Sequence, residues 1–278
     1  MKYVSFLRTD GQASYGRVLG EGIADLRAAP AAPADLKSAI AEGTLATLSS
    51  AVRYPLAAVT LLPPLTNPGK IFCIGHNYES HRQETGRAKV EHPSVFLRFA
   101  DTLLAHGQPI VRPRVSEHLD FEGELALVIG KAGRRIAETD ALSHVFGYAC
   151  FNEASIRDWQ WHTSQFTPGK NFPATGAFGP WLVTPDVIAD LASLRVTTRL
   201  NGQVVQDQPI GDMIFPIPRL IAYLSAFTPL APGDVIVTGT PGGVGAKRTP
   251  PLWMKPGDVV EVEIGPMGVL QNSIVEEI

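Results

Sequence analysis

The stretch DFEGELALVIG, residues 120–130, is strongly β-prone, which indicates a strand in the expected fold. It also carries two carboxylates two positions apart. Side chains alternate between the two faces of a strand. One face would carry Phe121, Gly123, Leu125, Leu127 and Ile129, and the other would carry Glu122, Glu124, Ala126 and Val128. The Cα atoms of the two glutamates would lie roughly 6.6–6.8 Å apart, so both carboxylates can reach one ion. Gly123 adds no bulk and allows a neighbour to approach closely.

Two carboxylates on one face repel each other, so one must stay protonated or a cation must neutralise both. A third acid, Glu153, follows an apolar run in GYACFNEASIRDWQ, residues 147–160. Carboxylates without clustered Cys or His favour a hard ion such as Mg²⁺, Mn²⁺ or Ca²⁺ over zinc. The spacing alone also fits a solvated strand face, with Glu153 capping a helix.

A second polar segment, IFCIGHNYESHRQETG at residues 71–86, places His81 three residues before Glu84. On a short helix that ends near Gly86 the two side chains share a face. A carboxylate partner holds a histidine in one tautomer and makes it more basic, as a general base requires. The same spacing fits an exposed surface pair. His76 has no such partner and is expected to be structural.

Two further loops contain residues that could meet a ligand. Lys170 in FTPGKNF, residues 166–172, could meet an anionic substrate, although most loop lysines are only solvated. VTGTPGGVGAKRTP, residues 237–250, fails both the phosphate-loop and the dinucleotide-binding spacings. It is expected to be a glycine-rich bend whose backbone could approach a ligand.

The composition excludes several classes of protein. Of 278 residues 45% are apolar and 18% are charged, and the net charge is −3 with no long basic cluster. This argues against nucleic acid or an anionic membrane as a partner. Cys73 and Cys150 lie in apolar stretches and are expected to be buried thiols. No run approaches the ~20 apolar residues of a membrane span, and no signal-peptide core is found, so we expect a cytoplasmic protein.

Strand patterns outnumber helices and do not alternate with them, which predicts an α+β, mostly β fold. The best helix covers residues 216–227, and Asn201-Gly202 predicts a tight hairpin. A proline-rich stretch, residues 54–70, divides a small N-terminal α+β domain, residues 1–65, from a larger catalytic domain, residues 66–278.

These segments, in this order, make residues from about 66 to 278 resemble the fumarylacetoacetate hydrolase family. The resemblance implies a mixed β-roll, a homodimer and a bound divalent metal, with Mg²⁺ favoured and Mn²⁺ or Ca²⁺ possible. It also implies chemistry on small 2-oxo or 1,3-diketo acids. Members of the family cleave, hydrate, isomerise or decarboxylate such acids.

The resemblance also assigns roles to residues. It implies metal ligation by Glu122, Glu124 and Glu153, a catalytic pair of His81 and Glu84 on a mobile lid helix, catalysis and substrate binding by Lys170, and substrate contacts from Arg98, Gln160 and Thr240. Two positions depart from the family pattern. Glu153 stands where Asp is usual, and Arg98 stands where Lys is frequent.

The activity expected from these roles is hydrolysis of a C–C bond in an acylpyruvate or fumarylpyruvate, as in aromatic-compound catabolism. The alternative is decarboxylation of an oxaloacetate-type acid, or keto–enol isomerisation or hydration, with the same metal site. A metal-binding protein without catalysis is a third possibility.

Overall fold

The computed structural model describes residues 1–278 as nineteen strands and five α-helices. The strands are β1 Lys2–Leu7, β2 Ala13–Leu19, β3 Gly22–Asp25, β4 Arg53–Pro55, β5 Thr60–Leu62, β6 Ile71–Gly75, β7 Ser94–Leu97, β8 Leu103–Leu104, β9 Ile110–Arg112, β10 Leu119–Asp120, β11 Gly123–Ile129, β12 Val145–Glu153, β13 Ser155–Ile156, β14 Gly176–Val183, β15 Arg195–Leu200, β16 Gln203–Pro209, β17 Val235–Val237, β18 Val259–Glu263 and β19 Val269–Glu276. The helices are α1 Leu36–Ala41, α2 Glu79–Glu84, α3 Arg157–Gln160, α4 Thr167–Lys170 and α5 Ile217–Phe227. The predicted α+β, mostly β class is confirmed.

The strands form two large sheets that contain both parallel and antiparallel pairs. The first follows the order β4-β3-β2-β1-β14-β12-β11-β17-β6-β7, with β5 paired to β1 and β8 paired to β14. The second follows the order β16-β15-β18-β19-β9. Parallel pairs join β17 to β6, β14 to β8 and β19 to β9, while the remaining neighbours are antiparallel. A small third sheet pairs β10 with β13.

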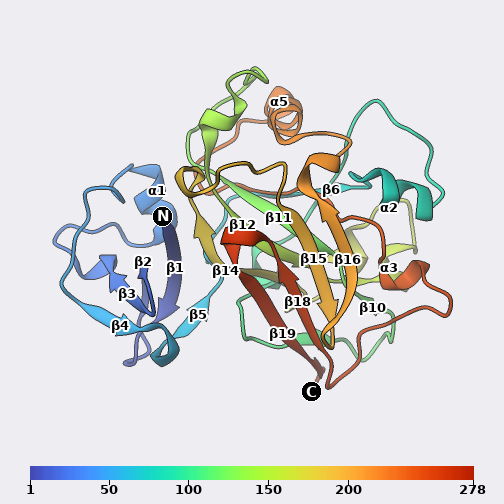
Figure 1. Ribbon diagram of the computed structural model, residues 1–278, viewed down its shortest axis with the longest axis horizontal. Helices are drawn as coiled ribbons and strands as arrows, with labels where there is room; N and C mark the ends of the chain where they lie inside the picture. The colour runs from blue at the N-terminus through green and yellow to red at the C-terminus, as the bar shows by residue number, and fades with distance from the viewer.

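The N-terminal strands form the lobe on the left of Figure 1, beside the larger body that carries the site. The lobe has its own apolar cluster around Val4, Phe6 and Ile23. It is also joined to the larger body, because β1 pairs antiparallel with β14. The division at residue 65 remains a prediction, since a continuous sheet crosses it.

Strand β11 shows the predicted alternation, but neither of its faces is solvated. Leu125, Leu127 and Ile129 pack into the largest apolar core, together with Phe121 just before the strand. Ala126 and Val128 pack into a second core on the opposite face. Every residue of β11 is buried, because β12 and β17 flank it and other elements cover both its faces.

Gly123 allows the close approach expected of it. A Cβ atom at this position would lie 2.0 Å from Oγ1 of Thr198 on β15. The backbone N–H of Gly123 also donates a hydrogen bond to Oε1 of Gln206 on β16, at 3.0 Å. The second sheet therefore packs directly against the strand that carries the two glutamates.

Several local predictions are confirmed. Helix α5 buries Ile217, Leu220, Ile221 and Leu224 along one side, and the hairpin residues Asn201 and Gly202 both have positive φ. Helix α1 follows Asp35, whose side chain accepts a hydrogen bond from the Ser38 N–H, and it ends at Ala41. Both cysteines are free and buried.

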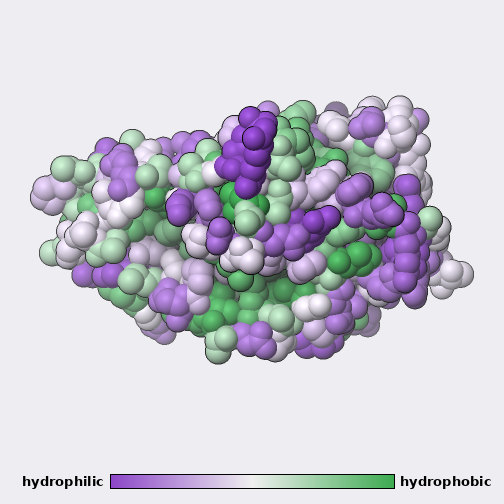
Figure 2. All heavy atoms as spheres, turned by 90° about the horizontal axis from the view of Figure 1, so that it is seen from above, coloured by the Kyte–Doolittle hydropathy of each residue, from purple (hydrophilic) through white to green (hydrophobic).

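The surface and the helices add two observations. On the face seen from above, polar and apolar residues are mixed (Figure 2). None of the helices combines the length and the hydropathy needed to cross a bilayer.

The contact at Gly123 gives a testable prediction. Gly123→Ala should destabilise the protein by about 1–3 kcal/mol, because the new methyl group collides with the Thr198 hydroxyl. Thr198→Ala alone should cost little, since this buried hydroxyl has no hydrogen-bond partner. The double variant should recover most of the loss in chemical denaturation. Equal losses in the single Gly123→Ala and double variants would contradict the packing argument.

Candidate metal centre and catalytic site

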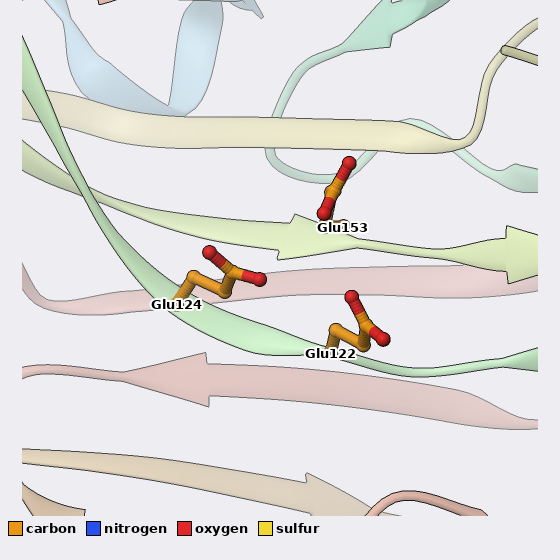
Figure 3. A group of neighbouring side chains, drawn as sticks. All are labelled: Glu122, Glu124 and Glu153. Atoms are coloured by element: carbon orange, nitrogen blue, oxygen red, sulfur yellow. The ribbon is translucent and has the colours of Figure 1, made fainter. Parts of the chain in front are cut away.

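Three carboxylates meet where β11 begins and β12 ends. Glu122 directly precedes β11, Glu124 lies within it, and Glu153 is the last residue of β12. The backbone N–H of Glu153 donates to the carbonyl oxygen of Glu122 at 2.8 Å, which aligns the two strand ends. One carboxylate oxygen from each residue lies within 4.8 Å of the others, and Figure 3 shows the side chains gathered in one region.

Burial rules out the solvated-face alternative for these acids. Glu122, Glu124 and Glu153 are 4%, 1% and 1% exposed. The Glu153 carboxylate faces Lys170 Nζ at 3.2 Å, and no side-chain cap is found at α3. Lys170 also contacts Glu122 at 2.6 Å, so one buried ammonium group bridges two of the three acids.

The cationic partners are distributed unequally. Glu122 has a second partner in Arg157 Nη2, at 2.7 Å, and Glu153 has one in Arg98 Nε, at 3.4 Å. Glu124 has no cationic partner within 4.0 Å and accepts a hydrogen bond from the backbone N–H of Gly239. The protein therefore supplies no adjacent positive charge to balance a negative charge on the Glu124 carboxylate.

The pKa values follow this distribution. Burial, with Glu153 and Glu122 nearby, raises the pKa of Glu124 well above its ordinary value. Burial acts in the same direction on Glu122, but Arg157 and Lys170 outweigh it and lower the pKa of that group. Burial would lower the pKa of Lys170, yet Glu122 and Glu153 raise it.

The residues present fit a divalent cation. All three side chains supply hard oxygen donors, and their oxygens are close enough together to share one ion. Glu124 is a buried acid that lacks a cation, and a bound ion would supply one. The identity of the metal remains a proposal.

The contact predicted between His81 and Glu84 on the short helix is formed. His81 Nδ1 lies 2.7 Å from Glu84 Oε1 on α2, which leaves Nε2 as the free ring nitrogen. His81 is 5% exposed and lines the cavity beside the carboxylates, so the alternative of an exposed surface pair does not hold. The other oxygen of Glu84 accepts from the Gly243 N–H at 2.9 Å.

The glycine-rich bend approaches carboxylates with its backbone. Its amides at Gly239, Gly243 and Gly245 donate to Glu124, Glu84 and Asp120 respectively. A further amide, from Gly242, donates to the Ser80 hydroxyl on α2 at 3.0 Å. One loop thus forms hydrogen bonds both to the α2 helix and to a carboxylate of the three-glutamate cluster.

The cavity beside these groups has a volume of about 100 Å³. Of the residues predicted for the site, the cavity is lined by His81, Glu122, Glu124, Glu153, Gln160, Lys170 and Thr240. This volume is well below the ~300–1,000 Å³ typical of sites for drug-sized ligands, so the cavity suits a small molecule.

Arg98 does not line this cavity. Its guanidinium lies behind Glu153 and donates to Thr175 Oγ1 at 2.9 Å and to the Ala154 carbonyl at 3.0 Å. The planar fork expected to grip a substrate carboxylate is occupied by protein groups. In this structure Arg98 supports Glu153 and does not face the cavity.

The sequence interpretation did not assign Arg157 or Asp120. Arg157 lines the cavity and donates to Gln160 Oε1 at 2.8 Å. Asp120 is fully buried and accepts from Arg157 Nε at 2.8 Å and from the N–H groups of Gly245 and Ala246. The three-residue spacing from Arg157 to Gln160 was a usable signal, but nothing in the sequence linked Asp120 to the distant bend.

His76 also faces the cavity. The sequence indicates a structural role for it, because no carboxylate partner is expected. Its ring stacks on that of His81, with centroids 5.1 Å apart and planes 16° apart. Burial, together with His81 and Arg87, lowers the pKa of His76 to about 4. The ring is therefore neutral near pH 7.

Comparison with known proteins identifies the family. The family model "Fumarylacetoacetate (FAA) hydrolase C-terminal" matches residues 70–275. The chain belongs to the fumarylacetoacetate hydrolase family.

Relatives with names and structures support this assignment. Human oxaloacetate tautomerase FAHD2A, mitochondrial, is 40% identical over 267 residues, covering 92% of this chain and 85% of that protein. Oxaloacetate tautomerase YisK of Bacillus subtilis is 44% identical over 225 residues, covering 80% of this chain and 75% of that protein. The fumarylacetoacetate hydrolase of Exiguobacterium antarcticum is 34% identical, with a TM-score of 0.89 over all of both chains, and confirms the predicted family fold.

Two names bear on earlier expectations. Both curated relatives are tautomerases, which favours the keto–enol alternative over C–C hydrolysis. The human protein is named as mitochondrial, so the cytoplasmic location expected for this chain remains a prediction.

Substitution of Glu124 should have opposite consequences with and without metal. Without metal, Glu124→Gln should leave the melting temperature unchanged or raise it, because it removes a buried acid that lacks a cation. Added Mg²⁺ or Mn²⁺ should raise the melting temperature of the wild type and have little effect on the variant. Equal stabilisation of both proteins by metal would contradict ligation by Glu124. Glu261→Gln on β18, half-buried and outside the cavity, is not expected to alter the response and serves as the control.

The lowered pKa of His76 predicts a pH-dependent loss of stability. Unfolded histidine takes up a proton near pH 6.5, whereas the folded group does so only near pH 4. Stability from this group is therefore lost as the pH falls through that window. His76→Asn, which tolerates the positive φ of 54°, should lose less. Parallel melting curves against pH for the two metal-free proteins would contradict the assignment.

Proposed function

We propose that this protein catalyses keto–enol tautomerisation of oxaloacetate with a divalent metal held by Glu122, Glu124 and Glu153. The observation that carries the proposal is the free Nε2 of His81 on the same small cavity as three buried oxygen ligands. The names of the relatives favour oxaloacetate as the substrate.

A bound divalent ion would supply Lewis-acid polarisation of the 2-oxo group, which makes the neighbouring C3 protons more acidic. His81 Nε2 would take a proton from C3 while Glu84 stabilises the charge on the imidazole ring. The C3–H bond breaks, the C2–C3 double bond forms, and the same proton returns to the 2-oxo oxygen as the enol hydroxyl. Lys170 lies beside Glu122 and Glu153 and would offset negative charge that develops in the cavity.

Isomerisation suits the enclosed geometry because it adds no second reactant. Hydrolysis of a C–C bond requires a water molecule placed between the base and the distal carbonyl group, and decarboxylation requires no base at C3. The His81–Glu84 pair is compatible with hydrolysis as well, so that reaction is tested in parallel. The homodimer implied by the family resemblance also stays a proposal.

The decisive assay follows the ultraviolet absorbance of enol oxaloacetate in the presence of Mg²⁺, with EDTA as the metal-free arm. His81→Ala should lower kcat by about 10²–10⁴-fold, because proton transfer loses its base. Glu84→Gln should lower kcat less, since the ring keeps a hydrogen-bond partner but loses the compensating charge. Gln83→Ala, exposed on the same helix, is the matched control and should leave kcat unchanged.

Different outcomes identify different reactions. Pyruvate released at the rate of enol loss would replace tautomerisation by decarboxylation. Faster metal-dependent cleavage of an acylpyruvate than isomerisation of oxaloacetate would support the hydrolase. Full tautomerase activity in His81→Ala would contradict the role of the histidine.

A further inference from the structure

The mouth of the cavity carries two cations that the metal site and the acid–base pair do not use. Arg87 follows α2, and Lys247 lies at the end of the glycine-rich bend; both are exposed, and both line the cavity. Neither forms an ion pair with a carboxylate of the protein. Their charges are therefore available to a ligand.

The charge of the cavity favours a dianion. Apart from the histidines, four cationic and three acidic side chains line it. A divalent ion would raise the excess to three positive charges. A 2-oxo acid with one carboxylate would neutralise one of them, whereas a 2-oxo dicarboxylate would neutralise two.

Lys247 lies near an aromatic ring and on a segment whose backbone is anchored. Its ammonium group lies 5.9 Å from the ring centroid of Trp161, which directly follows α3 and also lines the cavity. The two preceding residues, Gly245 and Ala246, donate their N–H groups to Asp120. Asp120 also accepts from Arg157, which contacts Glu122, so the bend that carries Lys247 is tied to the metal site.

Arg87 differs from Lys247 in the contacts that position its backbone and side chain. It comes just after Gly86 at the end of α2, and its guanidinium lies 6.0 Å from the Phe166 ring centroid. Its backbone N–H donates to the Arg82 carbonyl oxygen at 3.0 Å and its own carbonyl oxygen accepts from the Arg82 guanidinium, so its backbone is tied to α2 and not to the carboxylates of the cavity. Lys247 is therefore the cation whose position relative to the three carboxylates is better fixed.

We propose that Lys247, held against Trp161, receives the distal carboxylate of a 2-oxo dicarboxylic acid and so determines the preference for dicarboxylates. The 2-oxo end of the ligand lies at Glu122, Glu124 and Glu153, and the far carboxylate points to the mouth. Trp161 acts as a positioning residue, because it directs the lysine through a cation–π contact. This inference deepens the proposed function and rests on it.

The test compares a long with a short dianion on the full-length, Mg²⁺-loaded protein. L-malate carries a distal carboxylate on a four-carbon chain, and oxalate carries none. Calorimetry should show that Lys247→Met weakens malate binding by about fivefold, the upper range for an exposed charge pair, and changes oxalate binding by less than twofold. The KM for oxaloacetate should rise by a similar factor with little change in kcat.

Two further variants sharpen the result. Lys255→Met removes the same charge from an exposed position outside the cavity and should change neither affinity. Trp161→Leu should reproduce the selective loss for malate, and Trp161→Leu with Lys247→Met should lose no more than Lys247→Met alone.

Each remaining outcome overturns the assignment. Equal weakening of malate and oxalate would indicate a general electrostatic effect. Unchanged affinities would show that Lys247 does not contact the ligand, and a selective loss in Arg87→Met alone would move the distal carboxylate to the end of α2. The proposed function can fail separately. A wild-type protein that lacks tautomerase activity, but whose preference for malate over oxalate depends on Lys247, would support the Lys247 binding site and contradict the tautomerase reaction.

Discussion

Burying three carboxylates in one small volume is the constraint on which the rest of the site depends. Such groups are unfavourable in an apolar interior unless cations and hydrogen-bond donors compensate them. The chain supplies Lys170 from α4, Arg157 from α3 and Arg98 next to β7. These partners satisfy Glu122 and Glu153 and leave Glu124 with a backbone donor and no cation, which is why we propose a bound divalent ion there.

The glycine-rich bend, residues 237–250, also positions the side chains of the site. Its backbone amides donate to Glu124 in the carboxylate cluster, to Glu84 beside His81 and to Asp120 beside Arg157. Backbone donors occupy little space and lose no side-chain entropy when they are fixed. A single loop therefore helps to set the relative positions of the clustered carboxylates, the helix that carries His81 and the mouth of the cavity.

The same frame is compatible with several reactions, as members of one family often demonstrate. In this chain the cavity is small, one ring nitrogen of His81 is free, and Lys247 and Arg87 carry unpaired charges. The proposed proton transfer on a short dicarboxylate rests on these features.

The sequence by itself determined the elements that depend on local periodicity: the alternation of β11, the pairing of His81 with Glu84 and the stripe of α5. Spacing along one strand or helix fixes such contacts. It could not show that β11 is buried on both faces, that Arg98 lies behind Glu153, or that Asp120 joins two distant segments. Lys170 and Glu122 are 48 residues apart and Gly239 and Glu124 are 115 apart, so only the packing of the sheets brings them together. The tertiary structure alone therefore decided which charges are compensated and which remain free for a ligand.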